Sequence, residues 1–192
     1  TTLANLPDEV NVFTRLLLLV ERCMLHGQLG ELAQEQKYQH QIRDLAYRSG
    51  NYTFFVEATI WLGGSEKMRG NLHRSESYCK EALTLAHQYG GRLYPPAGRA
   101  HLQLAEIYYE WRDFPQAADH LEQGLEIGKS VGIGDYIWWG YEGLARVHDA
   151  QGNLDEGDRA LGSLRSYIQE ETQATSDFNP MDYFNWIEAQ FA

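Results

Sequence analysis

One stretch of sequence decides the fold, and it reads LARVHDAQGNLDEG over residues 144–157. Two earlier segments repeat its pattern around Asn71 and Asp113, so that Asn71, Asp113 and Asn153 follow one another at offsets of 42 and 40 residues. Each copy has a small residue eight positions before this Asn or Asp and another four positions after it. These six small residues are Gly63, Ala105, Ala145, Ser75, Ala117 and Gly157. A period of this length is typical of stacked helical hairpins.

The small residues indicate where the two helices of each hairpin approach each other. Antiparallel helices joined by a short turn can pack closely only where neither helix carries a bulky side chain. Asp113 and Asn153 are residue types favoured at the N-cap of a helix, and Pro115 suits the first turn that follows. We therefore predict helix–turn–helix hairpins in which the small residues of the two helices face each other.

The repeated residues carry a resemblance to a known family. The pattern resembles the tetratricopeptide repeat (TPR). It consists of Leu-Ala, six further residues, Gly-Asn-Leu-Asp-Glu, a small residue and a later Leu. The period exceeds the about 34 residues of that repeat. It is similar to the elongated variant in large bacterial transcription activators of the maltose-regulon type, which carry a LuxR-type DNA-binding end. Residues 92–111 and 120–126 carry this closer likeness, within a resemblance that covers about residues 54–165.

The resemblance implies both a fold and a function. The expected fold is all-α, a superhelical stack of about four elongated TPR-like hairpins with a closing C-terminal helix. The expected function is that of a non-catalytic domain that receives a small effector or a partner protein and relays this binding to ATPase and DNA-binding parts outside the chain. The alternative is a general TPR scaffold that binds a peptide or helix of another protein. A small inducer requires a closed concave pocket, whereas a scaffold groove is long and open.

We expect one TPR-like domain over residues 1–192. Residues 1–50 form a degenerate first repeat, whose first helix ends at His26-Gly27 and whose turn is the weak copy Gly27-Gln28-Leu29. Its second helix is unusually polar, which we attribute to the contact of a terminal repeat with water. Full repeats follow at 51–91, 92–132 and 133–171, and a closing helix or truncated repeat lies at 180–192. The expected helices cover about 8–25, 30–48, 52–69, 73–89, 96–111, 115–131, 135–151, 155–170 and 181–191.

Composition limits the classes of function. The formal net charge is −11, and a DNA-binding chain neutralises phosphates with Lys and Arg, so we expect no nucleic-acid binding by this chain alone. The 2 cysteines make no disulfide framework, and Cys79 falls on a predicted core position, as suits a reduced, cytoplasmic protein. The apolar run 16–20 is too short to span a membrane, so we expect no membrane partner. The sequence leaves self-association open.

Motifs for catalysis and metal binding are missing. Gly128-Lys129-Ser130 resembles the end of a P-loop, but that motif needs glycine where Gln123 stands, and the triplet closes a predicted helix. None of the 7 histidines stands at a metal-ligand spacing, and no serine lies in a nucleophile elbow. We therefore predict no catalytic residue, no metal and no cofactor.

The candidate binding surface is the concave side of the stack, which the first helix of each hairpin lines in TPR proteins. Its inward positions lie six and three residues before the small residue of that helix, and one and four after it, because these steps keep to one helix face. The second copy supplies Arg99, Leu102, Glu106 and Tyr109, and the third supplies Trp139, Glu142, Arg146 and Asp149. The first copy supplies Glu57, Ile60, Gly64 and Lys67.

The chemistry of this surface suggests its ligand. Trp138 and Trp139 are adjacent in the sequence, so they point in different directions on a helix and both cannot face the core. Arg99 and Arg146, next to aromatic residues, suit an anionic or sugar-like small effector or an acidic peptide of a partner. Alternatively, the two arginines only pair with Glu106, Glu142 and Asp149 on neighbouring helices.

Overall fold

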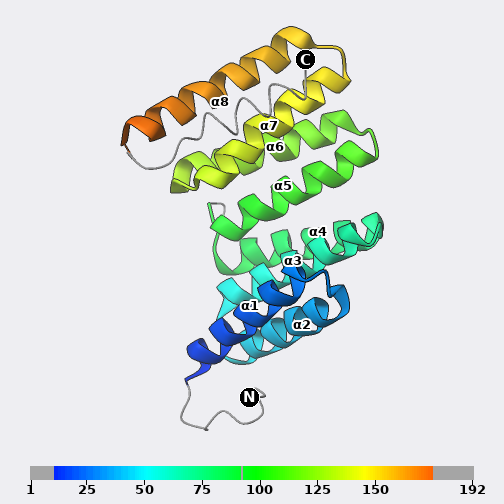
Figure 1. Cartoon of the computed structure of the whole chain (residues 1–192), viewed down its shortest axis with the longest axis vertical. Coiled ribbons are helices and arrows are strands. Elements are labelled where there is room, and N and C mark those ends of the chain that lie inside the picture. The colour runs from blue at the N-terminus through cyan, green and yellow to red at the C-terminus, as the bar shows by residue number, and fades with distance from the viewer. Residues whose placement is uncertain (1–10, 92, 175–192) are drawn as a thin grey trace.

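The computed structural model describes residues 11–91 and 93–174, and every regular element in these ranges is a helix (Figure 1). The helices are α1 (Val12–Gln28), α2 (Leu32–Arg48), α3 (Tyr52–Met68), α4 (Leu72–Tyr89), α5 (Pro95–Glu110), α6 (Phe114–Val131), α7 (Gly134–Ala150) and α8 (Leu154–Ala174). They form four antiparallel hairpins stacked along the long axis of the molecule. The all-α prediction is confirmed, whereas the closing helix expected at 181–191 lies outside the described residues.

A residue with left-handed backbone joins the two helices of each hairpin. These residues are Gly30, Gly70, Arg112 and Gly152, with φ between 58° and 79°. Our placement of the first turn at Gly27-Gln28-Leu29 is therefore wrong. Helix α1 continues to Gln28, and Gly30, with a φ of 72°, makes the turn. Glycine adopts this backbone without the steric cost that a Cβ brings, so the position of the turn follows Gly30 and not Gly27.

The paired small residues lie between the helices of their hairpins, as predicted. All six are buried. A Cβ added to Gly63 of α3 would lie 3.2 Å from the Cys79 sulfur and 3.3 Å from the Ser75 carbonyl oxygen of α4. In the last hairpin a Cβ on Gly157 would lie 3.5 Å from the Ala145 carbonyl oxygen. The short distance between these helices therefore depends on the small side chains that the sequence repeats.

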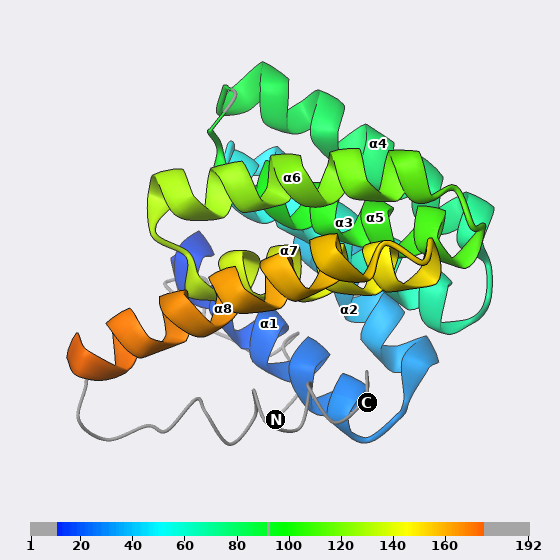
Figure 2. The same ribbon diagram turned by 90° about the horizontal axis from the view of Figure 1, so that it is seen from above.

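The stack has an inner side and an outer side. The second helix of each hairpin packs against the first helix of the next, and the first helices α3, α5 and α7 also contact one another in sequence. Within the described residues the second helices α4, α6 and α8 make no such contact with each other. The first helices therefore lie on the concave side. Figure 2 views the stack along its length and shows successive hairpins rotated relative to one another.

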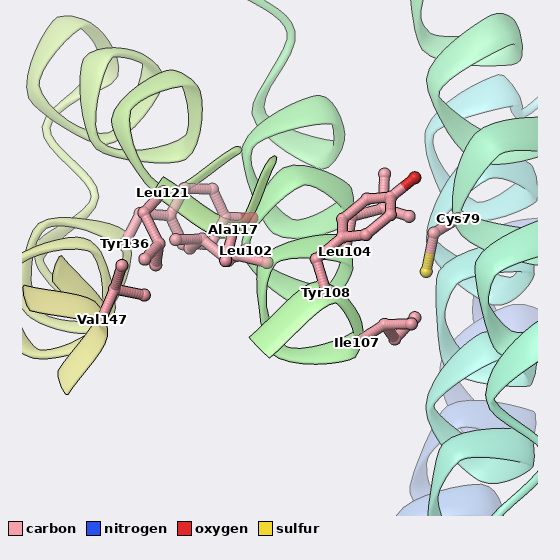
Figure 3. Packing of buried hydrophobic residues seen from close by; sticks show 10 residues of the cluster. Cys79, Leu102, Leu104, Ile107, Tyr108, Ala117, Leu121, Tyr136 and Val147 are labelled. Carbon is pink, nitrogen blue, oxygen red and sulfur yellow. The ribbon is translucent and has the colours of Figure 1, made fainter. Parts of the chain in front are cut away.

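Helix α5 lies in the middle of the core and packs in two directions. Its residues Leu104 and Tyr108 point towards Cys79 of α4, whereas Leu102 lies beside Leu121 of α6 (Figure 3). All of these side chains are at most slightly exposed. Because α5 is fixed on both sides, side chains on its inward face have a rigid support.

Candidate binding groove on the concave face

The first helices line an open groove of about 800 Å³. Six of the eight predicted site residues border it, and three of the predicted positions of α3 do so as well. The residues concerned are Arg99, Leu102, Glu106, Trp139, Glu142 and Arg146, together with Ile60, Gly64 and Lys67. Tyr109 borders an adjoining hollow of about 380 Å³ that shares Lys67, Glu106 and Arg146 with the groove. Asp149 borders neither of these spaces.

Arg99 on α5 is held between an acid and an aromatic ring. Its Nε lies 3.4 Å from Oε2 of Glu57 on α3, and its guanidinium carbon lies 5.8 Å from the ring centroid of Tyr136 on α7. Burial raises the pKa of Glu57, while the Arg99 charge opposes that rise. The Arg99 Nε and the Glu57 Oε2 are buried without a hydrogen-bond partner among the described residues. These two buried atoms face each other at 3.4 Å, so the charge of Arg99 is balanced by Glu57 beneath the groove surface.

Arg146 on α7 has a similar arrangement. Its guanidinium carbon lies 4.7 Å from the ring centroid of Tyr109 on α5, and Nη1 lies 3.7 Å from Oε1 of Glu142. The latter distance exceeds that of a hydrogen bond. Burial raises the pKa of Glu142, Arg146 opposes this rise, and the charge of Glu106 adds to it. The expected pairing of Arg146 with Glu142 is thus present but loose, and it lies within one helix.

The other charges complete a mixed electrostatic surface. Lys67 of α3 forms an ion pair with Glu106 of α5. Each of the three groove cations, Lys67, Arg99 and Arg146, thus faces one carboxylate. Arg99 takes Glu57 as its partner, which the sequence reasoning did not name. Both arginines therefore lie next to an acidic residue, as the alternative interpretation expected. Neither arginine forms a hydrogen bond with that acid.

Large apolar side chains form the rim of the groove. Met24 of α1, Met68 of α3 and Trp139 of α7 are 60%, 66% and 46% exposed, respectively. Trp138, which also borders the groove, is partly buried and packs against the cluster of Leu164 and Ile168. Both tryptophans border the groove, but only Trp138 packs against the core, as expected from their adjacent positions on one helix. Unbranched methionines adapt to different apolar partners, so this rim suits an apolar portion of a ligand.

Helix α1 contributes residues that the sequence reasoning missed. Val20, Cys23 and Met24 line the groove at its N-terminal end. Once the first turn is set at Gly30, Cys23 takes the place of the small residue, and Val20 and Met24 fall on the inward positions three before and one after it. With the turn placed at Gly30, the same spacing rule would have predicted Val20 and Met24 as groove residues.

A buried polar contact closes the groove floor between the first two repeats. The Gln39 amide nitrogen donates to the Ser65 hydroxyl at 2.8 Å, and that hydroxyl donates to the Gln39 amide oxygen at 3.0 Å. Burial raises the pKa of the neighbouring Glu35, with Arg69 opposing the rise. Because Gln39 is 1% exposed, the attribution of polar residues in this helix to solvent contact is wrong here. Gln39 is polar because it bonds to α3.

Other chemistry is limited in the part of the chain that the structure describes. No group of His, Cys, Asp or Glu in residues 11–91 and 93–174 is arranged to hold a metal ion. Gly128 and Lys129 lie inside α6, where Gly128 packs against Tyr136. No described helix combines the length and the apolar character needed to cross a bilayer.

The stacked hairpins and their inner groove define a TPR-type helical repeat scaffold. The chain belongs to the family described as the MalT-like TPR region, whose sequence profile matches residues 2–182. None of the curated proteins compared with the chain matches it.

Solved structures share the fold at low sequence identity. BtubC (BKLC) from P. vanneervenii has a TM-score of 0.70 at 15% identity, over 91% of this chain and 70% of that one. A putative kinesin light chain with nearly identical TPR-like repeats, from Podosopora anserina, has a TM-score of 0.63 at 14% identity, over 92% and 96%. MamA has a TM-score of 0.50 at 13% identity, over 85% and 96%. At these identities the likeness concerns the fold alone.

Proposed function

We propose that this chain is the sensing and interaction domain of a bacterial transcription regulator. It binds a ligand in the concave groove and relays that binding to ATPase and DNA-binding parts outside the chain. The domain itself is not an enzyme. Membership of the MalT-like TPR family supports the regulatory role. Such a regulator works in the cytoplasm, where Cys23 and Cys79, both buried and free, remain reduced.

The groove carries this proposal. It runs across the first helices α1, α3, α5 and α7, which belong to four different repeats. A ligand that touches several repeats at once stabilises one relative arrangement of the hairpins. The helical stack can then transmit the change because each repeat contacts only its neighbours.

The shape of the groove favours an extended ligand. Its rim residues Met24, Met68 and Trp139 are between 46% and 66% exposed, so the groove opens to solvent along its length. A small inducer requires a closed pocket, whereas a polypeptide segment fits a long open groove. The open groove is also the observation that favours the second candidate function, a general peptide-binding scaffold.

The coding sequence on either side of this chain tests the regulatory proposal. A regulator of this type predicts a Walker motif before the chain and a helix-turn-helix after it. Flanking sequence with neither motif would contradict the regulatory role and leave the scaffold function.

The isolated chain should neither hydrolyse nucleotide nor bind duplex DNA at physiological salt. Its net charge of −11 repels phosphates, and Gln123 stands where a P-loop requires glycine. Electrophoretic mobility shifts and phosphate release by the purified chain check this expectation. Saturable DNA binding that weakens with salt would contradict it.

A further inference from the structure

The junctions between successive hairpins use the same two positions each time. One residue of a second helix lies at the contact with the first helix that follows, opposite one residue of that helix, and both are buried. Between α2 and α3 these residues are Gln39 and Ser65, which are joined by two hydrogen bonds. The equivalent pairs of the next two junctions belong to one apolar cluster (Figure 3); they are Cys79 with Ile107 and Leu121 with Val147. The contact between hairpins therefore repeats along the chain as the hairpins do.

The same two positions occur once more, on helices in hairpins at opposite ends of the stack. Figure 1 shows α1 near one end and α8 at the other. Leu25 of α1 lies 40 residues before Ser65, and Leu161 of α8 lies 40 residues after Leu121. Leu25 is 52% exposed, whereas its three counterparts are at most 2% exposed. Leu161 is only partly buried. Positions that are covered in each internal junction are thus open on α1 and α8.

A second pair of positions shows the same difference. Leu32 begins α2, and its carbonyl oxygen accepts a hydrogen bond of 3.0 Å from Arg69, the C-cap of α3. The equivalent residues at the ends of the stack are Leu154, which begins α8, and Leu29, the C-cap of α1. Their exposed fractions are 63% and 62%. An end face that contacts only water normally carries polar side chains, so these leucines indicate a contact with protein.

We propose that the α8 end of one copy of this chain stacks on the α1 end of a second copy, as α2 stacks on α3 within the chain. Leu161 then contacts Leu25 of the second copy, and Leu154 contacts its Leu29. The association is driven by the removal of these four side chains from water. Because the two copies use different surfaces, the contact is head-to-tail and extends into short rows of copies without closing as a dimer.

The internal junctions identify this occupant. The face of α1 that carries Leu25 corresponds to the faces of α3, α5 and α7 that pack against a second helix, and α8 is a second helix with the same spacing. A polar position matches as well. Gln36 of α2 donates a hydrogen bond to Glu66 of α3, and the equivalent residues at the ends are Asp158 and His26. An imidazole can donate to a carboxylate, so this pair is also complementary.

Charge limits the strength of the contact. Each copy carries a net charge of −11, so two copies repel each other. Arg165 of α8 and Arg15 of α1 also fall opposite each other, at the positions of Arg43 and Phe55. Salt screens these repulsions and leaves the apolar contact in place. Association should therefore become tighter as salt is added, which is the opposite of the behaviour of a charge-driven complex.

Sedimentation velocity of the whole chain tests the association. A contact between single helix faces is small and therefore weak, so the weight-average mass should reach at least about twice the monomer mass only between about 10 μM and about 1 mM. The increase should be larger at about 0.5 M than at about 0.05 M sodium chloride. A monomer at all concentrations and both salt concentrations, or association that weakens with salt, would overturn the proposal.

Two variants test the head-to-tail arrangement. Leu25→Glu blocks the α1 end and Leu154→Glu blocks the α8 end, and each alone should abolish association. Both side chains are exposed, so the core is unchanged, and equal melting temperatures check this. An equimolar mixture of the two variants should form a dimer and nothing larger, because one intact α8 end meets one intact α1 end. Met68→Glu, at an exposed position on the rim of the groove, is the matched control and should associate like the wild type.

The other possible contacts give different results. If α1 packed on α1 of the second copy, Leu154→Glu would associate normally and the mixture would form no dimer. If the concave groove held the second copy, Met68→Glu would abolish association. Either result would refute the head-to-tail contact. Leu25, Leu29 and Leu154 do not border the groove, so failure of this proposal leaves the proposed sensing function untouched, and the reverse holds as well.

Discussion

His101 of α5 and His120 of α6 form a buried contact in which their Nδ1 atoms lie 2.8 Å apart. One nitrogen must donate and the other accept, so the accepting ring must be neutral with its proton on Nε2. The pKa of His101 is lowered to about 4, first by burial and then by the neighbouring His120, with Asp119 opposing and His87 adding to the effect. Burial also lowers the pKa of His120, with Asp119 opposing and Lys80 adding to the effect.

This pair predicts a loss of stability in mild acid. The unfolded chain takes up a proton at His101 near pH 6.5, whereas the folded chain resists it down to about pH 4. The stabilisation is therefore complete above pH 6.5 and is lost as the pH falls towards 4. Between pH 7 and pH 5 the free energy of unfolding should fall by about 2 kcal/mol on account of His101.

Urea unfolding at the two pH values measures this effect. His101→Gln should reduce the pH dependence, while His40→Gln, at an exposed position of α2, should leave it unchanged. The same pH dependence in wild type and His101→Gln would show that the buried pair is not the cause.

Ala145 sets the distance between α7 and α8. It is 1% exposed, and its carbonyl oxygen faces Gly157 of α8. Ala145→Leu should lower the free energy of unfolding by about 1–3 kcal/mol, because the additional carbons have no space between the helices. Ala150→Leu, at an exposed position of the same helix, is the matched control. Equal melting temperatures of the two variants would mean that the assigned helix contact is wrong.

At the scale of helices, the buried carboxylate of Glu66 joins α2, α3 and α4. It accepts hydrogen bonds from the amides of Gln36 at 2.9 Å and Asn71 at 2.8 Å, and Arg74 and Arg69 lie 3.6 and 3.8 Å away. Burial acts to raise the pKa of Glu66, but these hydrogen bonds and positive charges outweigh it, so the pKa is lowered. The side chain therefore remains ionised and fixes the second repeat on the first.

Removal of this carboxylate should loosen the junction of the first two repeats. Glu66→Ala removes the acceptor of the partly buried hydrogen bonds from Gln36 and Asn71 and a carboxylate beside Arg69 and Arg74, which should cost about 1–3 kcal/mol of unfolding free energy. Glu122→Ala, on the exposed face of α6, should cost much less. Denaturant unfolding compares the two variants, and similar midpoints would show that Glu66 does not hold the junction.

The boundaries of these helices were largely predictable, because glycine, asparagine and proline mark them in the sequence. The first repeat was the exception. Gly27 and Gly30 both lie near its turn, and only the backbone geometry distinguishes them. The sequence also did not predict that Gln39 of α2 is buried. Its hydrogen-bond partner Ser65 lies on another helix, so the pattern of residues around Gln39 does not reveal the contact.

At the scale of the whole molecule, the helical register placed six of the eight predicted site residues at the border of the groove, but not Tyr109 or Asp149. It could not predict their partners, because these depend on how far neighbouring helices are shifted along each other. Arg146 of α7 lies over Tyr109 of α5, and Arg99 of α5 reaches both Glu57 and Tyr136. Such contacts between repeats follow from the superhelical arrangement and not from the spacing within one repeat.

The central claim is that the concave groove receives the signal. The transcriptional response of the proposed regulator, read from a reporter gene, tests this most directly. Arg99→Ala, Tyr109→Ala, Trp139→Ala and Arg146→Ala should each reduce the response by at least about tenfold, which corresponds to the loss of one charge-assisted or aromatic contact. Arg159→Ala on α8 should respond as the wild type does, and all five variants should be equally abundant. A normal response from all four groove variants, or a ligand bound on the outer side of the stack, would contradict the claim.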